Sequence, residues 1–247
     1  YKMPIVYLNK NIGETPKELI DKYKQANGVK KASYCGRLDP MASGLMIVLT
    51  EEDCKLQNKF QSTSKTYKFN IIVGISTDSH DPLNDNIKLY KEYINLDELT
   101  ELISKKYNGK IKQNYPLCSS YAIDVGFHKK IPLWEAFKNK IITTDYDLPY
   151  KFINVSNFKV LESKIINDND LFDEFMSDIN KVSDINDNFG KKEALEFYSN
   201  KKNNNYQVIS CQVSGSSGTY VRGLVRDIGK DLNKNCIVHR ISRISIY

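Results

Sequence analysis

One short loop in the sequence holds a carboxylate within tight backbone constraints. Residues 36–44 read Gly-Arg-Leu-Asp-Pro-Met-Ala-Ser-Gly, so Asp39 lies between Leu38 and Pro40 in a segment bounded by two glycines. A carboxylate fixed in this way can act as a nucleophile or as a general base. An Asp that precedes Pro is also a common way to make a turn, and a turn is the simpler interpretation of this loop taken alone.

Two other residues lie at positions from which they could assist such a carboxylate. Arg222 lies in the first turn of a predicted helix, directly after a second glycine-bounded loop, Gly215–Gly218. Tyr67 lies on a predicted strand, on the same face as the apolar residues of that strand. Taken singly, a solvated helix arginine and a packed core tyrosine are the simpler interpretations of these two residues.

The first half of the chain must position the loop at 36–44. Thr15-Pro16-Lys17-Glu18 predicts a capping box that begins a helix, and Asn27-Gly28 predicts its end. The residues that alternate from Lys65 to Ile75 predict a strand with one apolar face. Further predicted elements are strands over 5–8 and 45–49, short helices over 52–61 and 132–140, a polar loop over 78–86 and a helix over 96–107.

The second half must position Arg222. Strands are predicted over 152–161, 207–214 and 238–247, and Thr219 is predicted to cap a helix with Arg222 and Arg226 off its apolar stripe. Strands and helices interleave without a steady βαβ rhythm. We therefore expect an α+β fold with a mixed or antiparallel central sheet flanked by helices and loops, and not a doubly wound one.

Charge is distributed unevenly along the chain. The formal net charge is +6, yet residues 162–205 hold ten Asp or Glu and six Lys, a net of −4, which leaves +10 on the rest. A basic body favours a polyanionic partner, although lysine-rich faces that are merely solvated are the alternative. We expect residues 162–205 to be an Asn, Asp and Lys-rich insertion with marginal helices and a flexible end at 201–205.

Several classes of protein are disfavoured by composition. No apolar run reaches the length of a membrane span, and residues 1–10 lack the pattern of a signal peptide. Five cysteines without CxxC spacing and three separated histidines predict no metal site and a reducing environment. We expect no metal, no cofactor, no membrane partner and an intracellular, first of all cytoplasmic, location.

Four blocks of the sequence, in order, resemble the tRNA pseudouridine-55 synthases, the family of the bacterial TruB type and its dyskerin relatives. A lone Gly-x-Leu-Asp-Pro would be weak evidence, but four ordered blocks make chance a poor explanation. The resemblance covers about residues 4–161 and 206–247. Its blocks are the loop 36–44; Lys65-Thr66-Tyr67 with Gly74 and residues 77–81; residues 113–120 with 133–138; and residues 217–222, 227–229 and 241–244.

The resemblance implies the pseudouridine synthase fold and its reaction. The N1–C1′ bond of a uridine is broken, the uracil rotates, and the ring is rejoined through C5, which requires no metal, cofactor or energy source. Asp39 is implied as the carboxylate near C1′, with Arg222 paired to it and orienting it. Tyr67 is implied to stack on the uracil and to stand close to C5.

The resemblance also implies a set of RNA contacts, because the target base must leave its stack to reach such a site. Tyr220 and Ile241 match positions that line the uracil pocket. Tyr34 takes the place of a family histidine that opens the target loop, and Arg37 takes the place of the usual threonine. Candidates for contacts with RNA phosphates are Lys30, Lys31, Arg226 and Arg243.

We therefore expect one catalytic domain over residues 1–247, without the PUA domain into which family members commonly continue, acting as a monomer on uridine 55 in the T-arm loop of tRNA. Another RNA hairpin, in mRNA or rRNA, is the alternative substrate. A non-catalytic RNA-binding protein or folding chaperone, and a guide-RNA-dependent enzyme of the dyskerin kind, are further alternatives. We expect the acidic segment 162–205 to point away from RNA or to contact another protein.

Overall fold

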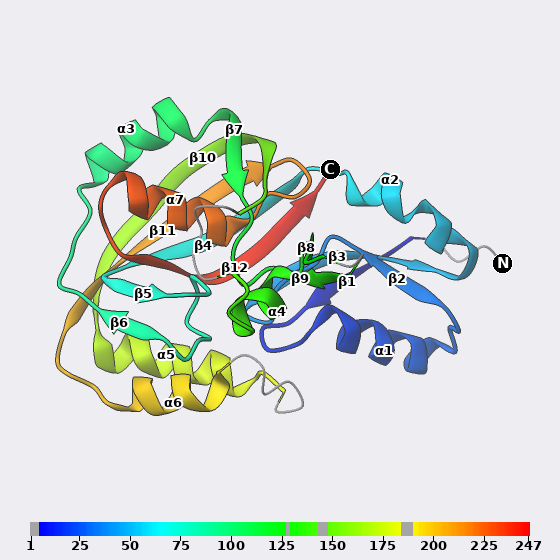
Figure 1. Ribbon diagram of the computed structural model, residues 1–247, viewed down its shortest axis with the longest axis horizontal. Coiled ribbons are helices and arrows are strands. Elements are labelled where there is room, and N and C mark those ends of the chain that lie inside the picture. The colour runs from blue at the N-terminus through cyan, green and yellow to red at the C-terminus, as the bar shows by residue number, and fades with distance from the viewer. Residues whose placement is uncertain (1–4, 127–128, 143–147, 184–189) are drawn as a thin grey trace.

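A mixed sheet of eight strands forms the centre of the molecule (Figure 1). The computed structural model describes residues 5–126, 129–142, 148–183 and 190–247. In the sheet the strands follow the order β1-β3-β12-β4-β11-β10-β7, with β2 paired to β3, and β3 with β12 is the parallel pair among otherwise antiparallel ones. The predicted α+β fold with a mixed sheet is confirmed. The strands of this sheet are β1 (Val6–Lys10), β2 (Ala32–Cys35), β3 (Ala42–Thr50), β4 (Lys65–Val73), β7 (Gly109–Asn114), β10 (Tyr150–Asn167), β11 (Asn205–Gly215) and β12 (Cys236–Ile246).

Helices and two small hairpins surround the sheet. The hairpins pair β5 (Ile75–Thr77) with β6 (Ile87–Leu89) and β8 (Ala122–Asp124) with β9 (Lys130–Pro132). The helices are α1 (Pro16–Asn27), the 3-10 helix η1 (Glu51–Leu56), α2 (Gln57–Gln61), α3 (Leu96–Lys106), α4 (Leu133–Lys138), α5 (Asp168–Asn180), α6 (Lys191–Ser199) and α7 (Val221–Asp231). None of the helices within the described ranges is long and apolar enough to cross a membrane.

The sheet separates two hydrophobic cores, because successive side chains on a strand point to opposite faces. On one face, Ile71 of β4 and Val238 of β12 pack with Leu224 of α7 and Leu99 of α3. On the other face, Ile72, the neighbour of Ile71, packs with residues of α5 and α6. Helix α7 lies across the sheet while α5 and α6 lie together below it in Figure 1. The fold thus places α7, which carries Arg222, on the face away from α5 and α6.

Two helix starts differ in how their first backbone N–H groups are satisfied. The predicted capping box of α1 is confirmed: Thr15 Oγ1 accepts from the Glu18 N–H, and the Glu18 carboxylate accepts from the Thr15 N–H. The prediction that Thr219 caps α7 is wrong. Its hydroxyl donates to the Ser216 carbonyl at 2.9 Å, and no side chain caps the start of α7 at Tyr220.

The helices of segment 162–205 pack against the sheet where the structure describes them, so the expectation of marginal helices is wrong for α5 and α6; a flexible end at 201–205 stays a prediction, and residues 201–204 form neither helix nor strand. Residues 162–167 extend β10, and residues 168–180 and 191–199 form α5 and α6; residues 184–189 of the predicted insertion lie outside the described residues. The reason is an apolar stripe within the polar composition. Leu171, Phe172, Phe175 and Ile179 of α5 are all 1% exposed or less.

Candidate active site

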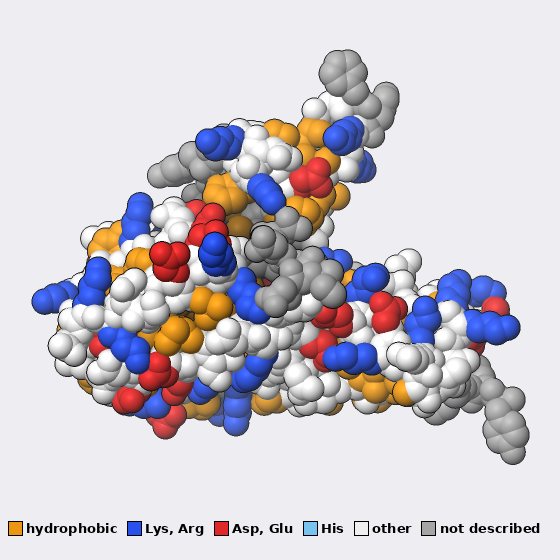
Figure 2. Space-filling view, turned by 90° about the horizontal axis from the view of Figure 1, so that it is seen from below, with side chains coloured by type: hydrophobic (Ala, Val, Ile, Leu, Met, Phe, Trp, Pro, Cys, Tyr) orange, Lys and Arg blue, Asp and Glu red, His pale blue; other side chains and the backbone are white. Residues whose placement is uncertain are grey.

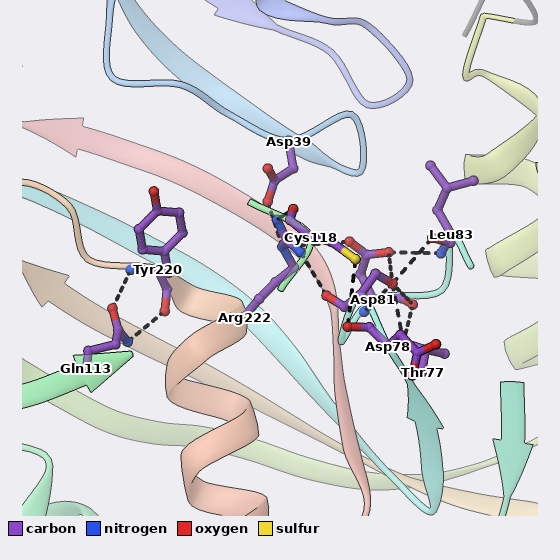
Figure 3. Close-up of polar contacts among 10 residues, drawn as sticks. Asp39, Thr77, Asp78, Asp81, Leu83, Gln113, Cys118, Tyr220 and Arg222 are labelled. Atoms are coloured by element: carbon purple, nitrogen blue, oxygen red, sulfur yellow. Dashed lines mark hydrogen bonds and ion pairs between the residues drawn. The ribbon is translucent and has the colours of Figure 1, made fainter. Parts of the chain in front are cut away.

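Asp39 and Arg222 are in direct contact although they are 183 residues apart in sequence. Asp39 lies in the loop between β2 and β3, and Arg222 rises from the first turn of α7 (Figure 3). Arg222 Nε donates to Asp39 Oδ2 at 2.8 Å, with the arginine side chain 4% exposed and the aspartate side chain 33% exposed. The implied pair is therefore formed, with the carboxylate on the open side and the guanidinium behind it.

Arg222 is fixed by three further groups, which explains how one side chain can aim the carboxylate. Nη1 donates to the Ser79 carbonyl at 2.8 Å and Nη2 donates to the Cys118 carbonyl at 3.2 Å. The Asp81 carboxylate lies 3.8 Å from Nε. Burial alone would lower the pKa of Arg222, but the carboxylates of Asp39 and Asp81 outweigh it and raise that pKa. The guanidinium thus remains a fixed positive charge.

Asp81 is a second carboxylate in the site, to which the sequence reasoning gave no role. Its Oδ1 accepts from Ser79 Oγ at 3.1 Å and from the Leu83 N–H at 3.0 Å. Burial raises its pKa to about 6, opposed by Arg222 and reinforced by Asp39. The predicted polar loop over 78–86 is polar but largely buried, because its short side chains, Thr77 included, satisfy one another and its own backbone. The sequence feature that could have pointed to Asp81 is the polar run Thr77-Asp78-Ser79-His80-Asp81, which follows a buried strand.

Tyr67 and Ile241 lie together beside the Asp39 loop. Both belong to the core that includes Leu38 and Ala42, and they are 7% and 8% exposed. Burial raises the pKa of the Tyr67 hydroxyl, while Arg243 next to it acts in the opposite direction. Tyr67 thus combines a packed ring with a hydroxyl that stays protonated near the carboxylate, as the implied role near a uracil ring requires.

Tyr220 is held in place by a side chain from a distant strand. Gln113 Oε1 accepts from the Tyr220 N–H at 2.9 Å, and Gln113 Nε2 donates to the Tyr220 carbonyl at 3.0 Å. Figure 3 shows Gln113 at the end of β7 and the Tyr220 ring on the side of α7 that faces Asp39. Burial, with the neighbouring Tyr115 and Asp39, raises the pKa of Tyr220 to about 12. Gln113 therefore fixes the backbone of Tyr220, the residue that precedes the first turn of α7, without capping the helix.

Arg243 stabilises the Asp39 loop through hydrogen bonds to backbone carbonyls on both sides of Asp39. It is 1% exposed, and its Nε and Nη2 donate to the carbonyls of Leu45 at 2.6 Å and Gly36 at 3.0 Å, on either side of Asp39. Gly36 has a φ of 80°, and a Cβ there would lie 3.2 Å from both Arg243 Nη1 and Lys65 Cε. The loop needs glycine at this position because the two cations approach its backbone closely.

The expected phosphate contacts of Arg226 and Arg243 do not fit their burial. Arg226 is 5% exposed; its guanidinium donates to the carbonyls of Asn114 at 3.1 Å and Tyr115 at 3.4 Å and to Asp227 at 2.8 Å. Arg226 lies off the apolar stripe, as predicted, but most of α7 is buried on several sides, so that direction is also protein interior. Both arginines therefore position backbone segments of the site.

The remaining candidate RNA contacts lie at the surface of the smaller lobe, the end of the molecule that holds β1, β2 and α1 (Figure 1). Lys30 and Lys31, directly before β2, are exposed, and their backbone N–H groups donate to the Glu51 carboxylate. Arg37 is exposed and its Nη2 donates to Tyr34 Oη at 3.1 Å. The structure therefore brings Tyr34 and Arg37 together at the rim of the Asp39 loop. Among the described residues, no group of three or more His, Cys, Asp or Glu side chains could hold a metal ion.

Comparison with known proteins identifies the family. The sequence profile of the TruB family pseudouridylate synthase (N-terminal domain) matches residues 24–163, which include Asp39, Tyr67 and Asp81. The chain belongs to the TruB family. The resemblance noted in the sequence is thereby confirmed.

Curated relatives of the TruB family match most of the chain at low identity. The tRNA pseudouridine synthase B of Mesoplasma florum is 26% identical over 243 residues, 98% of this chain and 68% of the relative. That of Ureaplasma urealyticum is 29% identical over 158 residues, 64% of this chain and 66% of the relative. The tRNA pseudouridine synthase 4 of Saccharomyces cerevisiae is 26% identical over 243 residues, 87% of this chain and 60% of the relative. The chain thus spans about two thirds of the length of these proteins.

Solved structures show the same fold. The Cbf5–Nop10–Gar1 complex contains a chain that matches with a TM-score of 0.58 at 16% identity, over 98% of this chain and 48% of the other. An H/ACA RNP bound to a substrate RNA containing 2′-deoxyuridine contains one that matches with a TM-score of 0.55 at 16% identity, over 97% of this chain and 46% of the other. This chain spans about half the length of those chains and shares the fold with that half.

Proposed function

We propose that this chain is an RNA pseudouridine synthase that isomerises a uridine, uridine 55 in the T-arm loop of tRNA. The Asp39–Arg222 pair carries the proposal: a carboxylate one-third exposed, with a buried guanidinium 2.8 Å behind it. Membership of the TruB family supports the reaction, and the names of the relatives, tRNA pseudouridine synthase B and 4, support tRNA as the substrate.

Asp39 supplies the carboxylate that the reaction needs near C1′ of the uridine. Because Arg222 bonds Oδ2, the direction of the carboxylate is fixed and its charge is balanced, with Oδ1 left for the substrate. This position serves both direct attack on C1′ and initial removal of the 2′ proton. In either route the N1–C1′ bond breaks, a C5–C1′ bond forms, C5 loses its proton and N1 gains one.

The side chains around Asp39 suit a planar, polar base. Tyr67 and Ile241 offer ring and aliphatic surface on one side of the Asp39 loop, and Tyr220 lies on the α7 side. A uracil between them would be shielded from water while its C5 lies near the Tyr67 hydroxyl. Since that hydroxyl remains protonated, it can donate a hydrogen bond or relay a proton.

The RNA around the flipped base needs a firm grip, because extrusion of a base costs a few kcal/mol. We assign this to the exposed cations Lys30, Lys31 and Arg37, with Tyr34 as the wedge at the rim. Figure 2 shows Lys and Arg side chains, interspersed with Asp and Glu, on the smaller lobe, which holds β1 and α1, and on the projecting segment that holds β8, β9 and α4. A hairpin loop seated between them would find Lys and Arg side chains for its phosphates on both sides.

The acidic segment 162–205 belongs to a different surface. Asp170, Asp173 and Glu174 line a groove beside α5, together with Lys164 and Arg240. Phosphates would be repelled by these carboxylates, so we propose that this surface does not contact RNA and is available to a protein. A single catalytic domain that acts as a monomer remains a prediction.

Another RNA hairpin is the second candidate substrate. Tyr34 occupies the rim position where the family has a histidine, and it bonds Arg37, which replaces the usual threonine. These two changes lie where the target loop would be opened, so they favour a difference in substrate over a difference in reaction.

The test is single-turnover conversion of a T-arm stem-loop whose target uridine carries tritium at C5. Bond formation at C5 must release tritium to solvent. We expect release by the wild-type chain and, with Asp39→Asn, a fall of roughly three orders of magnitude or more. Asp21→Asn, which removes an exposed carboxylate from α1, is the matched control and should keep the wild-type rate.

Each outcome separates the candidates. Release from the T-arm hairpin but not from scrambled loops supports tRNA, whereas release only from another hairpin in bulk cellular RNA supports the second candidate. Tight binding without release from any RNA would support the non-catalytic binder. Normal release by Asp39→Asn would contradict the assignment of Asp39.

A further inference from the structure

Three tyrosine rings form a continuous row that starts next to Asp39. Tyr220, whose pKa is raised in part by Asp39, contacts Tyr115 edge to face, with ring centroids 5.5 Å apart at 70°. Tyr115 stacks on Tyr121, with centroids 3.9 Å apart at 27°. The proposed position for the uracil uses only the first of these rings, so the row extends beyond the site of the reaction.

The backbone that carries the row is anchored at each ring. Gln113 holds both backbone groups of Tyr220, and Arg226 Nη1 donates to the Tyr115 carbonyl. The Tyr121 carbonyl accepts from the Leu133 N–H at 2.8 Å, at the start of α4. Rings held in this way lose little conformational freedom when a ligand stacks on them, which is the condition for a rigid binding platform.

Exposure increases along the row. Tyr220 and Tyr115 are half-buried, while Tyr121 is 37% exposed. Because Tyr115 covers one face of the Tyr121 ring at stacking distance, much of that exposure belongs to the other face and the ring edge. The row therefore ends in an aromatic surface open to solvent, two ring contacts away from the proposed uracil position.

We propose that the outer face of Tyr121 is a stacking platform for a nucleobase that flanks the target uridine. The inference rests on the proposed function and deepens it. Extrusion of one base exposes the faces of its neighbours, and an aromatic ring beside the proposed uracil position recovers the lost stacking without reading base identity. Tyr121 is thus a substrate-binding residue that fixes RNA position and has no part in bond breaking.

The first test measures two quantities for each variant, the RNA concentration that gives half-saturation and the maximal single-turnover rate, and asks which of them changes. Tyr121→Ala should raise the half-saturating concentration about tenfold and leave the maximal rate within twofold. Tyr121→Phe should behave as wild type, and Tyr121→Leu should behave as Ala, because bulk without an aromatic face does not replace stacking. Tyr93→Ala, which removes another exposed tyrosine ahead of α3, is the matched control and should change neither quantity.

The second test does not depend on turnover. Stem-loops with 2-aminopurine on the 5′ or the 3′ side of the target uridine are bound to the wild-type chain, and quenching of the fluorophore reports stacking. We expect quenching at one of the two positions, kept in Tyr121→Phe and lost in Tyr121→Ala and Tyr121→Leu. If the wild type quenches but releases no tritium, the proposed reaction fails and the platform stands.

Other outcomes overturn the platform. Absence of quenching at both positions, or no binding of the hairpins by the wild type, contradicts it. Equal behaviour of Tyr121→Leu and Tyr121→Phe in both assays would mean that the row merely fills space at the base of the projecting segment. A fall in maximal rate with Tyr121→Ala at unchanged half-saturation would also contradict it.

Discussion

The two faces of the central sheet are built from different kinds of interior. The face with α7 buries charge: Lys10, Lys65, Arg222, Arg226 and Arg243 are each 5% exposed or less and lie around the Asp39 loop or on α7. The face with α5 and α6 buries aromatic rings, with Phe172 in ring contact with Phe175, Tyr198 and Tyr206. Its buried carboxylates are Asp178, bonded to His239, Lys181 and Arg240, and Asp168, which accepts from the N–H groups of Lys202 and Asn204.

This difference indicates that the α7 face mainly fixes the positions of the site residues, while the α5 and α6 face mainly contributes to the free energy of unfolding. The buried cations of the α7 face donate to carbonyls of loops that have no regular structure of their own, as Arg243 does at Gly36 and Arg226 at Tyr115. Such groups fix position at a desolvation cost that apolar contacts must offset. The α5 and α6 face has fewer buried charges, namely Asp168 and the Asp178 cluster, and its close-packed rings can contribute net free energy.

Removal of one ring from the apolar face should have the largest effect on stability. Phe172 is fully buried, so Phe172→Ala should lower the free energy of unfolding by about 3–5 kcal/mol in urea denaturation. The single-turnover rate of the folded protein should stay within about twofold of wild type, since the ring lies across the sheet from Arg222.

The control on the other face is Leu224→Ala. Leu224 is also fully buried and follows Arg222 by two residues on α7. We expect a stability loss of about 2–5 kcal/mol together with a clear fall in rate, because the helix that aims Arg222 loosens. Equal rate losses in the two variants would contradict the separation between the faces.

Much of the fold could be predicted from periodicity. The capping box at Thr15, the alternation from Lys65 to Val73 and the apolar stripe of α7 were sufficient because each depends on neighbours within one or two turns. The packed α5 and α6 were missed because composition was weighed above the spacing of Leu171, Phe172 and Phe175. Burial of Arg226 was missed because an apolar stripe predicts one buried face, whereas α7 is buried on several sides up to Gly229.

The site residues that lie in sequence motifs could be predicted, whereas those that join the site only through long-range contacts could not. Asp39, Tyr67, Arg222, Tyr220 and Ile241 are brought together as the resemblance implied. Gln113 holds the backbone of Tyr220 across 107 residues, and Arg222 bonds the Ser79 carbonyl, next to Asp81, across 143 residues. No local pattern encodes contacts over such separations. No local pattern encodes the Tyr115–Tyr121 stack either.

A smaller effect, dependent on pH, is expected from Asp81 on the charged face. Its pKa of about 6 lies above the ordinary 3.8, so the ionised form destabilises the fold. This penalty is absent below about pH 4 and complete above about pH 6, and the gap between the two pKa values corresponds to about 3 kcal/mol. The free energy of unfolding of Asp81→Asn relative to wild type should therefore rise by about that amount from pH 4 to pH 7.

Denaturation in urea at several pH values measures this difference. Asp97→Asn, at an exposed position in the first turn of α3, controls for general effects of charge and should give no comparable rise. A difference that stays constant with pH would mean that Arg222 fully compensates the Asp81 charge. The two faces would then differ less in energetic character than their composition indicates.

The smallest effect is expected from a single hydroxyl, and its sign depends on the face. Tyr198 Oη on the α6 side is buried without a hydrogen-bond partner among the described residues, so Tyr198→Phe should raise the free energy of unfolding by about 1 kcal/mol. Tyr107 Oη on the α7 face donates to Asp231 at 2.6 Å, so Tyr107→Phe should lower it by about 1–2 kcal/mol. Both variants keep the ring, so urea denaturation of the pair isolates the hydroxyl. A lower free energy of unfolding in both variants would mean that the α5 and α6 face also depends on polar partners. Changes of opposite sign would show that this dependence is confined to the face that holds Asp39 and Arg222.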